Sequence, residues 1–127
     1  MRERGPHKAF ALYAHLTWHT RWRERCVEKR HVRTIVDSVL HAAQRHHIRV
    51  LAQSVLTEHV HVLVSYRPDC TLAAFVRDAK SESSRRAGEV TWCRGYYAGS
   101  VCEKHIAAVR TYIARQHTRH PDRIPPG

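Results

Sequence analysis

Two runs rich in β-branched and aliphatic residues, 48–56 and 59–66, are separated by only Thr57 and Glu58. Runs of this length and composition are typical of strands, and so short a connection predicts a hairpin. A hairpin of two strands is marginally stable in water unless further elements cover one of its faces. The rest of the chain is therefore expected to supply those elements.

In the segments on either side of the hairpin, apolar residues recur at the spacing typical of strands or of helices. Residues 9–20 and 96–101 are rich in aromatic and branched residues and are predicted strands, while 21–31 reads as a basic loop. Apolar residues recur at helical spacing over three further segments, which are 32–47, 71–86 with Thr71 as its N-cap, and 103–119. The chain thus alternates between the two periods rather than grouping all its strands together.

This order is strand, helix, strand, strand, helix, strand, helix, in a chain of 127 residues. It predicts an α+β fold, namely a ferredoxin-like split βαβ sandwich with an antiparallel sheet and an extra C-terminal helix. We expect one domain over residues 7–118. The prolines of "HPDRIPPG" cannot continue a helix, so residues 119–127 are expected to be a flexible C-terminal tail.

The charge of the chain narrows the class of partner. The 22 Lys and Arg residues against 11 Asp and Glu give a formal charge of +11, which attracts polyanions. Nucleic acid is favoured over an anionic membrane surface, because neither a basic amphipathic helix nor a lipid-anchor signal is evident. Four scattered cysteines match no structural zinc pattern, and no secretory or membrane-spanning segment is recognisable, so we expect a cytoplasmic protein with reduced thiols.

Two histidines interrupt the apolar run of the second hairpin strand. Alternation along a strand sends His59 and His61 to one face and Val60 and Val62 to the other. Two imidazoles on neighbouring same-face positions can reach one divalent cation. The alternative is a pair of surface histidines on an exposed sheet face.

A second pair of polar residues lies on the last predicted helix. Tyr112 and Gln116 are four residues apart and share a face beside an apolar stripe. Alone, Tyr112 could be a half-buried edge residue. Together with the histidines it suits attack of a tyrosine hydroxyl on a phosphodiester, with Mg²⁺ or Mn²⁺ held by the imidazoles and an amide oxygen.

At this point the sequence resembles a known family, the single-tyrosine HUH transposases of insertion sequences and the REP-associated tyrosine transposases. "YAHLTWHTRWR", "EHVHVLVS", "FVRDAKSESSRR", "WCRGYYAGSV" and "VRTYIARQ" match its motifs in order. The resemblance implies that His59 and His61 bind the metal, that Tyr112 is the nucleophile and that Gln116 is the third metal ligand. Glu58 stands where the family commonly has Asp, a mild departure.

The resemblance also implies a substrate and an assembly. Such enzymes cleave and rejoin single-stranded DNA beside imperfect hairpins through a 5′-phosphotyrosine, and relatives are homodimers in which one subunit delivers its tyrosine to the other's histidines. We expect the same here, with Gly99 as a pivot for the last helix. Two alternatives stay open: a catalytically silent DNA-hairpin binder, and an HUH replication initiator or relaxase.

Cations and aromatic side chains are available for the DNA, although charged runs are usually solvated and aromatics in strands usually buried. The candidate phosphate contacts are Arg21, Arg23, Arg25, Arg77, Lys80, Arg85 and Arg86. The candidates for stacking on unpaired bases are Trp18, Trp22, Trp92, Tyr96 and Tyr97. Of these aromatics, Trp18 and one of the two tyrosines are expected to be buried.

Overall fold

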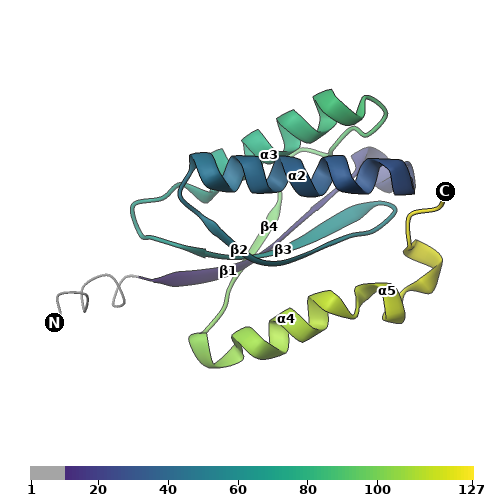
Figure 1. Ribbon diagram of the computed structural model, residues 1–127. Helices are drawn as coiled ribbons and strands as arrows, with labels where there is room; N and C mark the ends of the chain where they lie inside the picture. The colour runs from purple at the N-terminus through teal and green to yellow at the C-terminus, as the bar shows by residue number, and fades with distance from the viewer. Residues whose placement is uncertain (1–10) are drawn as a thin grey trace, which may run out of the picture.

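A computed structural model describes residues 11–127 (Figure 1). Its elements in chain order are β1 (Leu12–His19), η1 (Arg21–Arg23), α2 (Lys29–Arg45), β2 (Arg49–Val55), β3 (His59–Tyr66), α3 (Leu72–Ala87), β4 (Tyr97–Ser100), η2 (Glu103–His105), α4 (Ile106–Ala114), α5 (Gln116–Arg119) and η3 (Pro121–Arg123). Residues 7–10 of the predicted domain, and with them the start of the predicted first strand, lie outside the described residues.

The four strands form one sheet in the order β2-β3-β1-β4, and every neighbouring pair is antiparallel. Since β1 and β2 both run against β3 and flank it, they are parallel to each other, which is the split βαβ arrangement. Helices α2 and α3 cover one face of the sheet, and α4 and α5 lie across the other (Figure 1). The predicted α+β sandwich, its hairpin and its extra C-terminal helical segment are confirmed.

The main core lies between the sheet and the pair α2 and α3. Its largest members are Leu16, Trp18, Ile35, Val62 and Phe75, all of which are buried. The β1 and β3 members have even numbers, so the odd-numbered side chains of these strands face the other way, toward α4 and α5. The prediction that Trp18 is buried is confirmed.

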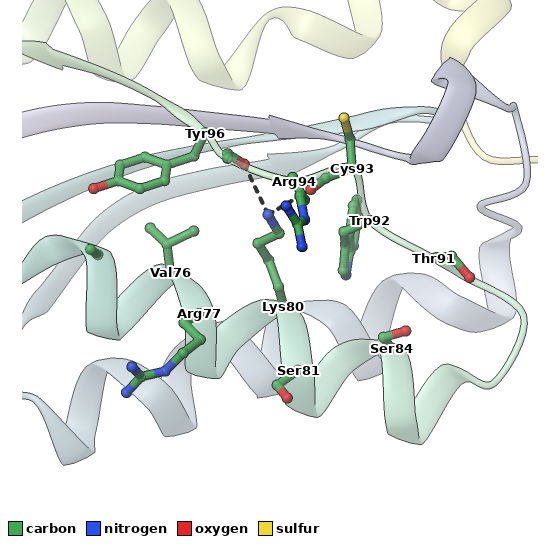
Figure 2. Close-up of a pocket in the computed structure, with 12 residues that line it drawn as sticks. Val76, Arg77, Lys80, Ser81, Ser84, Thr91, Trp92, Cys93, Arg94 and Tyr96 are labelled. Atoms are coloured by element: carbon green, nitrogen blue, oxygen red, sulfur yellow. Dashed lines mark hydrogen bonds between the residues drawn. The ribbon is translucent and has the colours of Figure 1, made fainter.

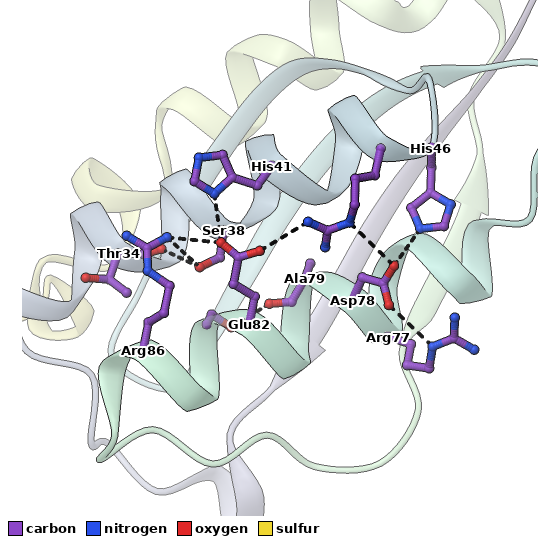
Figure 3. A network of polar contacts seen from close by, with 11 residues as sticks. Thr34, Ser38, His41, His46, Arg77, Asp78, Ala79, Glu82 and Arg86 are labelled. Carbon is purple, nitrogen blue, oxygen red and sulfur yellow. Dashed lines mark hydrogen bonds and ion pairs between the residues drawn. The ribbon is translucent and has the colours of Figure 1, made fainter.

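A polar network joins the outer sides of α2 and α3 (Figure 3). Glu82 accepts hydrogen bonds from Arg86 at 3.1 Å and from His41 at 2.8 Å. Asp78 pairs with His46 at 2.7 Å and with Arg77 at 3.5 Å. These partners lower the pKa values of both carboxyl groups, chiefly through the hydrogen bonds from His41 to Glu82 and from His46 to Asp78. The two acids therefore already neutralise part of the positive charge of this face.

Two details of the helices differ from the sequence-based expectations. Thr71 is the N-cap residue of α3 but makes no side-chain capping hydrogen bond. The last predicted helix is divided at Arg115 into α4 and α5, because the side-chain amide of Gln116 donates to the carbonyl of Tyr112, the acceptor of a regular helical bond.

Residues 119–127, expected as a flexible tail, lie against the domain. The backbone N–H of Thr57 donates to the carbonyl of Arg123 at 2.9 Å, and that of Lys29 donates to the carbonyl of Pro126 at 2.6 Å. Proline blocks a helix but leaves its carbonyl free to accept, which is how this segment docks. Among the helices of the described chain, none has the length and apolar character needed to span a bilayer.

Candidate functional site

The odd-numbered face of the sheet carries the predicted histidines beneath α4 and α5. Ile113 anchors α4 on this face and is completely buried, and the ring of His117 contacts the carbonyl oxygen of Val55 at 2.9 Å, which ties α5 to the end of β2. His59 and His61 are consequently only 8% and 7% exposed. The alternative of two surface histidines is wrong, because a helix covers their strand.

The two imidazoles point at a common space. Their Nε2 atoms are 3.1 Å apart and the rings meet edge to face at a centroid distance of 4.8 Å. Adjacent ligands of an octahedral cation with bonds of about 2.1 Å are separated by roughly 3.0 Å. The Nε2 separation therefore suits two ligands of one ion.

The other ring nitrogens have partners that set this orientation. Nδ1 of His59 lies 2.8 Å from a carboxylate oxygen of Glu58, so it carries the proton and leaves Nε2 with a free lone pair. Nδ1 of His61 lies 2.9 Å from Nε2 of His15 and 3.3 Å from the hydroxyl of Thr17. A carboxylate behind an imidazole is the usual support of a metal-binding histidine, and Glu58 fills this place.

Burial favours the neutral, ligating form of both rings. Desolvation is the main cause that lowers the pKa of His61 to about 3, and the charges of His59 and His15 add to it. Desolvation also lowers the pKa of His59, although hydrogen bonding to Glu58 acts in the opposite direction. The donor set thus fits a divalent cation at neutral pH.

These lowered pKa values predict a loss of stability in mild acid. The unfolded chain binds protons to these histidines near their ordinary pKa of about 6.5, whereas the folded chain resists protonation, so the free energy of unfolding decreases as the pH falls below that value. Thermal melts between about pH 7 and pH 5 should show a falling midpoint, and His61→Gln should flatten the slope. A midpoint that rises over this interval would contradict the burial of neutral imidazoles.

Tyr112 on α4 lies over the histidine pair. Its ring meets His61 edge-on at a centroid distance of 5.8 Å and His15 at 6.0 Å, and the guanidinium of Arg119 lies 5.6 Å from its centroid. Tyr112 is still 40% exposed, so a substrate can reach this side chain. The structure therefore brings together three of the four residues that the sequence singles out for chemistry.

Gln116 is placed differently. It is only 1% exposed, and its amide nitrogen donates to the carbonyl of Tyr112 at 2.9 Å. Within residues 11–127 no hydrogen bond joins Gln116 to either histidine. No group of three or more His, Cys, Asp or Glu side chains in the same range is arranged to hold a metal, so the pair needs an oxygen from another kind of group. Gln116 as third ligand stays a prediction.

Sequence reasoning missed two histidines of this site. His15 and His19 lie on β1, opposite Leu63 and His59 of β3, and both face the site. The ring of His19 stacks on that of His59 at 5.3 Å, and the ring of His15 lies 5.1 Å from that of His61. The sequence does indicate that His15 and His19 lie together, because two residues four apart in a predicted strand share a face.

The seven predicted DNA-binding cations are not equally free. Arg25 pairs with Asp122 at 3.5 Å, and Lys80 donates to the backbone carbonyls of Cys93 and Gly95 at 2.7 and 2.9 Å. Arg77 and Arg86 belong to the α2–α3 network described above. Three others, Arg21, Arg23 and Arg85, are exposed and have no ion pair with any residue of the described part.

The aromatic candidates divide in a similar way. Trp92 packs edge-on against Trp18 at 6.3 Å and donates its indole N–H to Ser83, so both rings are structural. Trp22 is exposed, and so are both Tyr96 and Tyr97. The expectation that one of these tyrosines is buried is wrong, because Tyr97 begins the edge strand β4 and Tyr96 lies in the segment before it.

Comparison with known sequences gives a consistent result. A family model described as "Transposase IS200 like" matches residues 8–116. The ISDra2 transposase TnpA of Deinococcus radiodurans is 25% identical over 129 residues, covering 92% of this chain and 92% of that protein. The transposase for insertion sequence element IS200 of Salmonella typhimurium is 28% identical over 81 residues, covering 54% of this chain and about half, 53%, of that protein.

Solved structures give the same fold. A crystal structure from Deinococcus radiodurans, whose protein is assigned as a transposase, matches with a TM-score of 0.66 and 25% identity over 85% of this chain and 92% of that chain. A REP-associated tyrosine transposase bound to a REP hairpin matches with a TM-score of 0.73 over 86% of this chain and 68% of that chain. At 16% identity, the second likeness concerns the fold alone.

Proposed function

This chain belongs to the IS200-like transposase family, and we propose that it cleaves and rejoins single-stranded DNA through a 5′-phosphotyrosine formed at Tyr112. The observation that carries the proposal is the position of Tyr112, whose half-exposed ring contacts His61 at 5.8 Å beside the two facing Nε2 atoms. Family membership also disfavours a replication initiator or a relaxase. A silent hairpin binder would not need the intact set of His59, His61, Tyr112 and Gln116.

We propose that His59 and His61 hold Mg²⁺ or Mn²⁺ through Nε2, with Gln116 as the third ligand through its amide oxygen. When bound, the ion would supply Lewis-acid polarisation of the phosphodiester. Glu58 orients His59 from behind, and His15 and Thr17 do the same for His61. To ligate, Gln116 has to turn its amide oxygen toward the pair while its nitrogen keeps the bond to Tyr112.

In the reaction, the hydroxyl oxygen of Tyr112 forms a bond to phosphorus and the bond from phosphorus to the 3′-oxygen breaks. The proton of the hydroxyl leaves with the departing strand, which ends as a free 3′-hydroxyl. Because the phosphotyrosine retains an ester bond, a 3′-hydroxyl can attack it and rejoin DNA. The guanidinium of Arg119 lies 5.6 Å from the centroid of the Tyr112 ring, and we propose that it balances charge on the phosphate.

For the substrate we propose a single strand that carries an imperfect hairpin. The support is the formal charge of +11 and the free cations Arg21, Arg23 and Arg85. The REP-associated relative of the same fold binds a REP hairpin, which agrees with this substrate. A direct test incubates end-labelled hairpin oligonucleotides with the protein, with and without Mg²⁺ or Mn²⁺. Nicking that leaves protein on the 5′ end supports the proposal, and intact DNA under all conditions opposes it.

We further propose a homodimer in which each subunit supplies its tyrosine to the other. Within one chain Tyr112 lies beside its own His61, so delivery in trans requires α4 and α5 to be exchanged between subunits. An exchange would give Ile113 and His117 the same contacts on the partner sheet, so little packing energy is lost. Gly99 lies inside β4, where the Tyr97 hydroxyl is 2.8 Å from the position of a Cβ, so any pivot lies beyond it, near Cys102.

Mixing two inactive variants, His61→Ala and Tyr112→Phe, tests this arrangement. In trans, a mixed dimer holds one intact site, built from the histidines of one variant and the tyrosine of the other. Random exchange then restores about a quarter of the sites. Activity is measured as covalent adduct on a labelled hairpin, after exchange has been verified with differently tagged subunits. A mixture that exchanges and stays inactive would establish delivery in cis.

A further inference from the structure

The turn after β1 holds an exposed tryptophan in an uncommon backbone conformation. Trp22 has φ 61° and ψ 15°, and Arg23 has φ 52°, so two consecutive non-glycine residues occupy the left-handed region. Each such residue is unfavourable, and the conformation persists only where its surroundings enforce it. Two hydrogen bonds from Thr20 close the turn. Its backbone carbonyl accepts from the N–H of Arg23 at 3.0 Å, and its hydroxyl donates to the carbonyl of Glu24 at 2.6 Å.

This turn places the indole of Trp22 in solvent. Trp22 is 84% exposed, whereas Trp18 is buried and Trp92 is packed against it. The guanidinium of Arg21 lies 5.7 Å from the Trp22 ring and stabilises its presentation. A large aromatic side chain that the fold holds in water, at a backbone cost, is the feature expected of a ligand contact rather than of a core residue.

Trp22 forms one wall of a groove of about 460 Å³. The groove is also lined by His19, Arg23, Arg94, Tyr96 and Tyr97. His19 also stacks on His59 at 5.3 Å, so the groove opens directly beside the histidine pair. A volume of this size is within the range of sites that hold one small ligand.

A second wall of the groove, the backbone of residues 93–95, is held in place by Lys80, which Figure 2 shows from the adjoining pocket. Its ammonium group donates to the carbonyls of Cys93 and Gly95, and Gly95 has φ 78°, which favours glycine. The backbone N–H of Cys93 donates to the carbonyl of His19 at 2.8 Å, so this loop continues alongside β1. Lys80, predicted as a phosphate contact, thus positions the wall that presents Arg94 and Tyr96.

We propose that this groove is a subsite for one unpaired nucleotide of the DNA strand that reaches the histidine pair, with its base stacked on the exposed ring of Trp22 and its phosphate contacted by Arg23 or Arg94. The inference rests on the proposed function and adds a subsite to it. Aromatic faces bind bases of any sequence, but only where the base face is not already stacked in a duplex. The subsite therefore selects single strands rather than a particular base.

Binding is tested in excess chelator, so that no cleavage is needed. The probes are a fluorescein-labelled ten-residue oligothymidylate and a blunt duplex of the same length, and affinity is read by fluorescence anisotropy. Trp22→Gly should weaken binding of the single strand about tenfold and leave binding of the duplex unchanged. Its melting temperature should not fall, because glycine adopts φ 61° without strain. Trp22→Phe should restore most of the affinity.

Two variants that each remove one positive charge distinguish binding at the subsite from general attraction of DNA to a basic protein. Arg94→Ala removes a cation of the groove, and Arg33→Ala removes an exposed cation of α2, a helix that does not line the groove. Arg94→Ala should weaken binding of the oligothymidylate several-fold more than Arg33→Ala. Equal losses, or a Trp22→Gly variant that binds the single strand like the parent, would overturn the subsite.

Failure of the subsite can be distinguished from failure of the chemistry proposed for Tyr112. If the parent protein forms the phosphotyrosine but Trp22 has no effect on binding, the subsite alone is wrong. If Trp22 governs binding of the single strand but no adduct forms with any hairpin, the groove binds DNA and the chemistry assigned to Tyr112 is wrong.

Discussion

Tyr112→Phe should bind hairpin DNA as well as the parent protein and form no covalent adduct, with cleavage reduced on the order of a thousandfold or more. The change removes one oxygen and leaves the ring contacts with His61 and His15. Its folding stability should hardly change, because the residue is 40% exposed and its hydroxyl makes no hydrogen bond within residues 11–127. Adduct formation is measured on denaturing gels with end-labelled DNA.

Tyr66→Phe is the matched control for this experiment. It removes the same atom from a tyrosine on the core side of β3, away from the histidine pair. It should form the adduct at the parental rate. A Tyr112→Phe protein that still attaches to a DNA 5′ end would assign the nucleophile to another residue, and Tyr97, on the same face of the sheet, would be the first to examine.

His61→Ala should reduce metal-dependent cleavage at least about a hundredfold, since loss of a supporting partner alone costs ten to a hundredfold in metal affinity and His61 is a proposed ligand itself. The imidazole removed is the one that Tyr112 contacts, and its Nε2 faces that of His59. Isothermal titration with Mn²⁺ should show a matching loss of affinity. DNA binding in chelator should be retained.

The control here is His41→Ala, which removes an imidazole from α2 on the opposite face of the sheet. Because His61 is 7% exposed, thermal melts must accompany the assay to separate loss of ligand from loss of fold. Parental cleavage by a folded His61→Ala protein, or cleavage by the parent in excess chelator, would remove the metal from the mechanism.

Much of the fold follows from local patterns. The hairpin was predictable because the two apolar runs 48–56 and 59–66 are separated by two residues, and the helices because their apolar residues recur at helical spacing. The direction of His59 and His61 followed from alternation alone, since Val60 and Val62 have to enter the core. These are properties of a few neighbouring residues, so one sequence suffices to read them.

Other features depend on residues far apart in the chain. That the histidine pair is buried depends on α4 folding back over the sheet, some fifty residues later. The division of the last helix depends on whether the Gln116 side chain competes for a backbone carbonyl, and the sequence does not determine that competition. Tyr96 and Tyr97 were expected to divide between core and solvent, but both are exposed at the edge of the sheet, in and just before β4.

The central claim, that Tyr112 becomes covalently joined to a DNA 5′ end, is tested most directly by mass spectrometry of the trapped adduct. The protein is incubated with a hairpin oligonucleotide and Mn²⁺, the DNA is digested with nuclease, and the protein is cleaved with trypsin. Arg110 and Arg115 bracket Tyr112, so the account predicts a nucleotide on the peptide 111–115, with fragment ions that assign it to the tyrosine. A nucleotide on any other peptide, or nicked DNA with no modified peptide, would contradict it.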